Sequence, residues 1–329
     1  MLAQVKRIIP KKLIIFAKLS RLYIYDFKRF FLHSNVNQTF DTDLKLKGKL
    51  TIYYHVIEKG LTMPETRLGF GESTLLELIS MLNMYMEKGY DTDALEFKHS
   101  VGTVKEYIDY HESKNYQLPS NIYKEATDIF SRISTNTPQT KQFLFNEKSY
   151  FTFSDSSFEK FALSRHSCRN YSNKPVPTEL LAQCIALAQK SPTSCNRQVN
   201  RAYIIKDTNV KKQVLSLQYG NRGFGHLAET LIVLTADISV FQGVNDRNES
   251  YVNTGMFAMS LLYALHHYRI GACPLNWSVD AARDNGLRKV LSIPHNERIG
   301  LVISCGFLPE NFMIASSPRL PHGLITKVF

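Results

Sequence analysis

The chain of 329 residues lacks the features that mark several common classes of protein. Its five cysteines form no CxxC pair, so the sequence predicts neither a disulfide framework nor a zinc site. It has no run of the ~20 apolar residues that a membrane-spanning helix needs, and no cleavage site follows the short apolar stretch near the N-terminus. No GxGxxG follows a predicted strand and no Walker A sequence occurs. We therefore expect a cytoplasmic protein without a Rossmann or P-loop nucleotide site.

The composition is that of a globular protein, with 44% hydrophobic and 21% charged residues. The formal net charge of +11 predicts an anionic partner, such as the phosphate of a cofactor or acidic lipid. No nucleic-acid-binding motif is present, and the basic residues do not alternate with aromatic ones. We expect no nucleic-acid partner.

Residues 1–34 carry eight Lys or Arg residues and a single Asp. Large apolar side chains recur there every three or four residues, at Phe16, Leu19, Tyr23, Phe27 and Phe30. This pattern predicts a basic amphipathic helix. Such a helix either lies on an anionic membrane surface or packs on the protein with its basic face in water.

A second segment, 40–72, mixes ionisable residues with turn formers. One interpretation is a helix end and a packed loop, with Lys59 near the C-terminus of the helix and Gly60 at its cap. The other is a lid or second site that uses three ionisable side chains, those of His55, Glu58 and Arg67.

Residues 73–133 have the periodicity of three helices, and residues 134–157 are rich in Ser, Thr, Asn and Pro, as linkers are. The pattern then changes. Helix-like segments at 179–190, 209–218, 251–268 and 280–291 alternate with β-rich ones at 202–206, 230–235 and 300–305. We expect a helical domain over 1–145 and an α+β domain, a sheet layered with helices, over 146–329.

The first candidate site segment contains Arg165, Ser167 and Arg169 just ahead of a predicted helix. Arginine offers a planar, permanently charged fork and serine a short neutral hydrogen bond, so together they suit a phosphate. The alternative is an ordinary basic surface. The second segment follows a helix, and Pro192 fixes its turn. Ser194, Asn196 and Gln198 then present donors and acceptors on alternate residues, which suits a heterocycle or a sugar chain; local bonds to the backbone are the other interpretation.

Taken together, the two segments resemble the motifs of the nitroreductase family of FMN enzymes. That family opens with Arg-Arg/His-Ser-x-Arg/Lys and continues with a Pro-Ser-x-x-Asn-x-Gln loop. The matching residues here are Arg165, His166, Ser167 and Arg169, followed by Pro192, Ser194, Asn196 and Gln198.

Four later segments resemble the family in the same order, as a central helix, a strand and loop near the flavin ring, a last core strand and a C-terminal phosphate-binding segment. They are residues 253–264, 268–277, 299–307 and 317–321. Two departures concern details of the site. The family's Gln-Pro-Trp is here Gln198-Val199-Asn200, and only Arg319 remains of two C-terminal basic residues.

The resemblance implies a three-layer α+β fold with a central, mostly antiparallel sheet, and FMN as cofactor. It implies that Arg165 and Arg319, with Ser167, hold the phosphate, and that Arg169 lies near the N1/O2 edge of the ring. Asn196 and its neighbours would hold the pyrimidine or ribityl groups. Pro274, Leu275 and Asn276 would lie near N5. The flavin, rather than a side chain, carries the redox chemistry.

The family resemblance further implies a homodimer with FMN at the interface, and a ping-pong reaction in which NAD(P)H reduces the flavin and a small molecule reoxidises it. The helical extension is similar to that of members associated with bacterial surface-polysaccharide synthesis. Two other classes stay open. The protein could be a non-catalytic flavin-binding or partner-binding module, or a peripheral membrane protein that acts on lipid-linked substrates.

Overall fold

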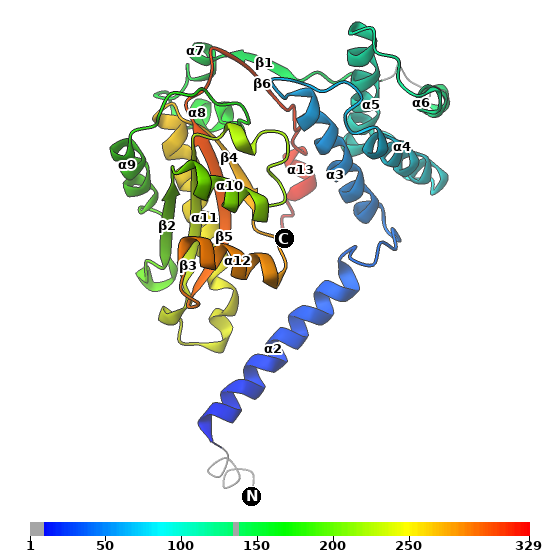
Figure 1. Cartoon of the computed structure of the whole chain (residues 1–329). Helices are drawn as coiled ribbons and strands as arrows, with labels where there is room; N and C mark the ends of the chain where they lie inside the picture. The colour runs from blue at the N-terminus through cyan, green and yellow to red at the C-terminus, as the bar shows by residue number, and fades with distance from the viewer. Residues whose placement is uncertain (1–9, 134–137) are drawn as a thin grey trace, which may run out of the picture.

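The computed structural model describes residues 10–133 and 138–329 (Figure 1). Within this part, the N-terminal half is helical, as predicted. Its helices are α2 (Lys11–His33), α3 (Asp43–Leu61), α4 (Glu72–Glu87), α5 (Leu95–Ser113) and α6 (Ser120–Arg132). Helices α3 to α6 pack around one apolar core, whose fully buried side chains include Ile57, Leu78, Phe97 and Ile122.

Helix α2 projects from the rest of the molecule as an isolated rod (Figure 1). None of its residues is buried. It is joined to the C-terminal half by Arg247, which donates two hydrogen bonds to the carboxylate of Asp26, at 2.7 and 2.9 Å. The predicted amphipathic helix is present from Lys11, and residues 1–9 of that prediction lie outside the described part of the chain.

The C-terminal half contains a four-stranded sheet in the order β2-β3-β5-β4. Its strands are β2 (Asn200–Ile205), β3 (Thr230–Asp237), β4 (Gly271–Asn276) and β5 (Glu297–Gly306). All three strand pairings are antiparallel. Three of the strands were predicted from composition, and β4 was implied by the family resemblance.

Helices cover both faces of this sheet. They are α9 (Thr178–Ala188), α10 (Thr208–Leu217), α11 (Glu249–His267) and α12 (Ala281–Leu291). Three shorter helices, α7 (Glu147–Tyr150), α8 (Phe158–Ser164) and α13 (His322–Ile325), come before and after the strands of this sheet in the chain. Side chains alternate across a strand, so Ile232 of β3 packs with α9 and α11 while Val233 packs on the side of α10 and α12. The expected three-layer α+β fold with an antiparallel sheet is confirmed.

A second, two-stranded sheet links the two halves. Strand β1 (Phe143–Asn146) pairs antiparallel with β6 (Asn311–Ile314), near the C-terminus. The domain boundary expected after residue 145 therefore falls within a strand that pairs with the C-terminal segment. This pairing brings residues 315–319 back against the helical half. Among residues 10–133 and 138–329, no helix is long and apolar enough to cross a membrane.

Candidate anion-binding cavity

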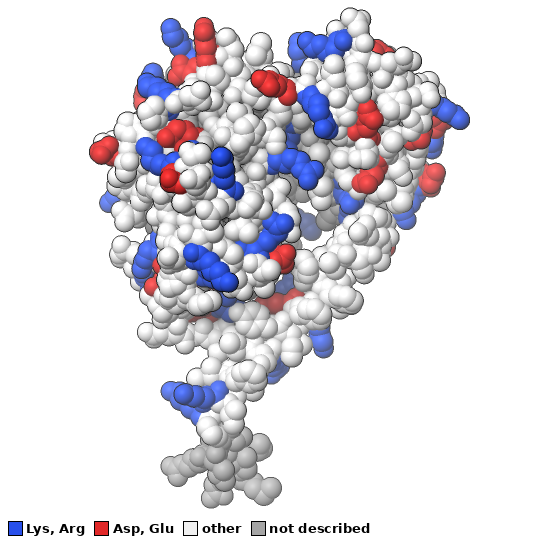
Figure 2. All heavy atoms as spheres, viewed as in Figure 1, with Lys and Arg blue, Asp and Glu red and all other residues white. Residues whose placement is uncertain are grey.

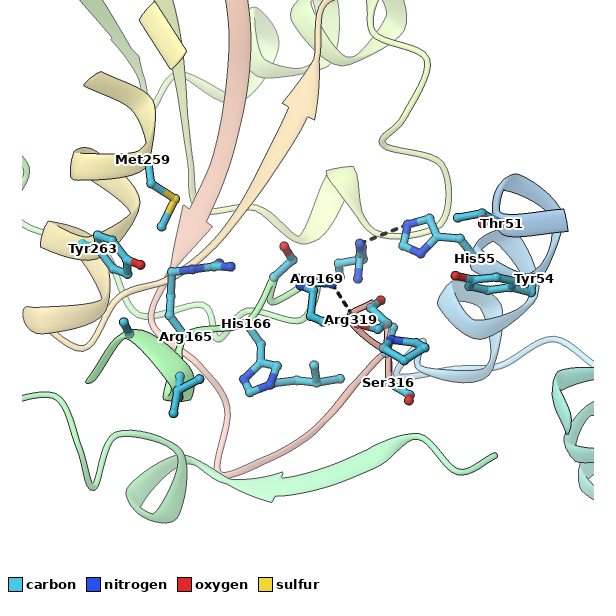
Figure 3. A pocket seen from close by; sticks show the side chains of 17 residues that line it. Thr51, Tyr54, His55, Arg165, His166, Arg169, Met259, Tyr263, Ser316 and Arg319 are labelled. Carbon is cyan, nitrogen blue, oxygen red and sulfur yellow. Dashed lines mark hydrogen bonds between the residues drawn. The ribbon is translucent and has the colours of Figure 1, made fainter. Parts of the chain in front are cut away.

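A cavity of about 710 Å³ lies between α3, the segment after α8, and the C-terminal segment after β6 (Figure 3). Its lining combines five basic side chains with hydroxyl and apolar groups. The basic residues are His55, Arg165, His166, Arg169 and Arg319, and the polar ones include Thr51, Tyr54, Ser167, Ser316 and Ser317. No carboxylate occurs among the described residues that line it.

Extended backbone after α8 positions the first predicted motif. The N–H of Cys168 donates to the carbonyl of Ala272 on β4 at 3.0 Å, and the hydroxyl of Tyr150 accepts the N–H of His166 at 3.0 Å. Cys168 is buried in the core, while its neighbours Arg165, His166, Ser167 and Arg169 line the cavity. The structure thus brings these predicted residues together.

Arg165 is the part of the cavity that most clearly requires a ligand. Its Nη1 atom is buried and has no hydrogen-bond partner within the described part of the chain. A buried cationic donor left unpaired is costly, and a bound anion removes that cost. Burial lowers the pKa of the neighbouring His166, and the charges of Arg165 and Arg319 act in the same direction. The donor set fits a phosphate group.

The C-terminal segment supplies another side of the cavity. Ser316, Ser317 and Arg319 all line it, and Arg319 Nη1 donates to the carbonyl of Ser317 at 2.8 Å. Ser317 has a φ of 41°, in the left-handed region that serine seldom adopts. The predicted partnership of Arg165 with Arg319 is therefore spatially consistent, although 154 residues separate them in the chain.

Helix α3 forms the opposite wall, which the sequence did not identify clearly. Thr51, Tyr54 and His55 face the cavity, and His55 Nε2 lies 3.5 Å from Nη2 of Arg169 (Figure 3). The ionisable residues of segment 40–72 were the available signal. The structure contains elements of both interpretations given for that segment. His55 contributes to a site, whereas Arg67 is exposed in a turn after the helix.

The predicted loop at 192–198 lies elsewhere in the chain's own fold and is absent from the cavity lining. The backbone N–H of Ser194 donates to Asn253 Oδ1 at 3.0 Å, which fixes the loop on α11. Asn196 and Gln198 are exposed and have φ values of 53° and 47°. Pro192 is exposed as well. Strained backbone that presents polar side chains outward is common in ligand-binding loops.

The residues predicted to lie near N5 of the flavin, Pro274, Leu275 and Asn276, are on strand β4, at the edge of the sheet. Pro274 and Asn276 are exposed on one face, while Leu275 points into the core with 4% of its surface exposed. Leu275 can therefore offer a ligand only its main chain. The carbonyl of Asn276 already accepts a hydrogen bond from Gln218 Nε2 at 2.9 Å.

The similarity to known proteins lies in the C-terminal half of the chain. Residues 162–221 and 210–307 match the family model described as the nitroreductase family. Iodotyrosine dehalogenase 1 homolog of Caenorhabditis elegans is 21% identical in an alignment of 197 positions that covers 50% of this chain. The chain spans 59% of the length of that curated relative.

Two solved structures illustrate the similarity. A nitroreductase family protein from Streptococcus pneumoniae is 20% identical, with a TM-score of 0.46, covering 53% of this chain and 100% of that one. An FMN-dependent nitroreductase from Clostridium difficile is 20% identical, with a TM-score of 0.41, covering 46% and 87%. The part of the chain from residue 162 to residue 307 therefore carries the similarity to the nitroreductase family.

Proposed function

We propose that the protein is an FMN-dependent oxidoreductase whose cavity binds the phosphate of the cofactor. The observation that carries the proposal is the buried, unpartnered Nη1 of Arg165 in a cavity lined by three arginines and no described carboxylate. Bound FMN would supply two-electron redox chemistry. The match of residues 162–307 to the nitroreductase family model supports this choice over other phosphates.

The chain's own residues would then bind and orient the cofactor. Arg165 and Arg319 would neutralise the phosphate, with Ser167 adding a neutral hydrogen bond. Arg169, beside His55, would place a positive charge where the reduced ring carries its negative charge. Tyr54 and His55 of α3 would shield that side of the cavity from water.

A homodimer would complete the site. Loop 192–198 is hydrogen-bonded to α11 but lies outside the cavity of its own chain. Apolar side chains are exposed on the neighbouring helices, including Phe158, Leu163 and Val252, with 72%, 75% and 54% of their surface accessible. Pairing of two chains across this face would bury those side chains. It would also let the loop of one chain, with Ser194, Asn196 and Gln198, reach the FMN of the other.

The reaction we propose is ping-pong, with NAD(P)H as electron donor and a small molecule as acceptor. The helical half suggests a dedicated task, and we propose surface-polysaccharide synthesis as its setting.

The direct test of the proposed function is spectroscopic. Protein reconstituted with FMN and freed of excess should be yellow, and anaerobic NADH or NADPH should bleach the flavin absorbance. Protein that never retains FMN would refute the proposal, and retained flavin that neither nucleotide reduces would favour a binding module.

Helix α2 favours a second role, at a membrane surface. Phe16, Phe27 and Phe30 are 70%, 67% and 67% exposed, on a helix without a buried residue. Its one acid, Asp26, is already paired with Arg247, so its remaining side-chain charges are positive. An aromatic face bordered by lysine and arginine is typical of helices that lie on anionic lipid. We propose that α2 brings the enzyme to such a surface.

A further inference from the structure

The segment that carries Arg319 is held in place from the helical half. Two successive backbone N–H groups, those of Ser316 and Ser317, donate to side chains of that half or of the linker that follows it. Ser317 N donates to Glu58 Oε1 at 3.2 Å, and Ser316 N donates to Gln142 Oε1 at 2.9 Å. Gln142 is itself bound by Glu106 of α5, through bonds of 3.0 and 2.7 Å.

Glu58 is a carboxylate in the interior of the helical half. Its side chain has no exposed surface, although a buried carboxylate is costly unless it is well paired. Oε1 contacts His99 Nε2 at 2.7 Å, and Oε2 lies 3.8 Å from His55 Nδ1 without a hydrogen bond. Burial alone would raise the pKa of Glu58, but the neighbouring side chains of His55 and His99 lower it to about 2. The group is therefore ionised across the physiological range.

A chain of contacts runs from Glu58 to the cavity. Glu58 accepts the N–H of Ser317, and the carbonyl of the same residue accepts Nη1 of Arg319 at 2.8 Å. Ser317 adopts the left-handed conformation between these two contacts. Because this conformation is unfavourable for serine, it persists only where surrounding contacts maintain it. The buried carboxylate is such a contact.

We propose that Glu58 is a positioning residue of the anion cavity: it fixes the backbone of Ser317, and through it the guanidinium of Arg319. The inference rests on the proposed function, since the anion is taken to be the phosphate of FMN. It extends that function by making the helical half a structural part of the cofactor site. The same contacts allow two other roles for Glu58. It could stabilise the packing of the helical half without affecting the site, or its negative charge could offset the charge of the arginines.

Near-isosteric variants separate these roles. Glu58→Gln keeps an acceptor oxygen and removes the charge, whereas Glu58→Met removes both and leaves the N–H of Ser317 without this acceptor. His111→Leu is the matched control. His111 is equally buried in the helical half and likewise accepts a backbone N–H, that of Gly69 at 3.0 Å, but its hydrogen bonds are to Gly69 and Tyr107 and not to residues 314–319.

The experiment measures FMN dissociation constants by flavin fluorescence, inhibition of FMN binding by inorganic phosphate, and amide hydrogen exchange of residues 314–319. We expect Glu58→Met to weaken FMN binding about tenfold. This corresponds to the loss of one charge-assisted hydrogen bond, that between Arg319 and the phosphate. Exchange in 314–319 should quicken in the same variant, with or without FMN. Glu58→Gln and His111→Leu should stay close to wild type in affinity.

Three results would overturn the inference. Unchanged affinity and exchange in Glu58→Met would show that the contact positions nothing. An equal loss in His111→Leu would assign the effect to general destabilisation, and an equal loss, or a gain, in Glu58→Gln would assign it to charge. Failure of the wild-type protein to bind FMN or phosphate would refute the proposed function itself, and is seen before any variant is made.

Discussion

His55 Nε2 lies 3.5 Å from Nη2 of Arg169, so the anion cavity is closed by two side chains from different halves of the chain. Arg169 comes from the part of the chain that matches the nitroreductase family model, and His55 comes from α3 of the helical half. Figure 2 shows Lys and Arg side chains in the notch between these two halves. The helical half therefore shapes the site directly and is more than an appended module.

Removal of the two phosphate-facing arginines should abolish cofactor retention. Charge-assisted hydrogen bonds are worth about 1.5–3 kcal/mol each, so the double variant Arg165→Ala/Arg319→Ala should weaken FMN binding by about 100-fold or more. Equilibrium dialysis with FMN measures the loss. Arg201→Ala is the control, because Arg201 is a half-exposed arginine on β2 outside the cavity. Stoichiometric flavin in the double variant would show that the phosphate lies elsewhere.

Much of the fold could be predicted because its signals are local. The helices α9 to α12 and the strands β2, β3 and β5 follow from periodicity and composition, within about three residues of their ends. The short strands β1 and β6 carry four residues each and depend on a partner about 170 residues away. No local pattern could show that pairing.

The site divides in the same way. Arg165, Ser167 and Arg169 could be predicted because they lie close together in the sequence and combine the positive charge and the hydroxyl group that suit a phosphate. The wall formed by Thr51 and Tyr54 could not be predicted, because it depends on how two halves pack. The separation of loop 192–198 from the cavity could not be predicted either. The order of motifs in a sequence does not indicate whether two motifs meet within one chain or between two chains.

Stability should fall in mildly acidic solution because of His266. Burial, and then the charge of Arg165, lowers its pKa from 6.5 to about 4. In the unfolded chain His266 takes up a proton below about pH 6.5, whereas in the folded chain it does so only near pH 4. The contribution to the free energy of unfolding is therefore fully present above pH 6.5 and declines as the pH falls from 6.5 to 4. The lost stability is about 3 kcal/mol for this one residue.

Urea unfolding at pH 7.5 and pH 4.5 measures this decline. His266→Gln should reduce the difference between the two pH values, although it lowers stability at pH 7.5 by losing the contact with Ser164 Oγ at 2.8 Å. His295→Gln, at an exposed position, should leave the difference unchanged. An identical pH dependence in wild type and His266→Gln would contradict the assignment.

Deletion of residues 1–34 should reduce binding to anionic membranes. We expect full-length protein to pellet with vesicles of phosphatidylcholine and phosphatidylglycerol, and less with phosphatidylcholine alone, since the exposed face of α2 combines aromatic and basic side chains. Phe27→Ser/Phe30→Ser should weaken pelleting without altering the charge. Equal pelleting of all forms would reject the membrane role. If the deletion instead dissociates a dimer, α2 binds a second copy.

The proposed homodimer makes a prediction that a single-chain site does not. One variant would lack the clamp (Arg165→Ala/Arg319→Ala), and another would lack the loop contacts (Asn196→Ala/Gln198→Ala). Each should bind FMN poorly alone. If the loop acts on the cavity of the partner, a mixed dimer has one site with both clamp and loop intact. If loop and cavity belong to the same chain, it has none.

Mixing the two variants under conditions that exchange subunits should therefore restore FMN binding to about one quarter of all sites, because half of the dimers are mixed and each has one intact site. Flavin fluorescence titration before and after exchange measures the recovery. Mixing either variant with itself is the control for the exchange procedure. Absence of recovery, with mixed dimers demonstrated by a tag on one variant, would place the loop outside the partner's site. The exposed, left-handed backbone at Asn196 and Gln198 would then need another explanation.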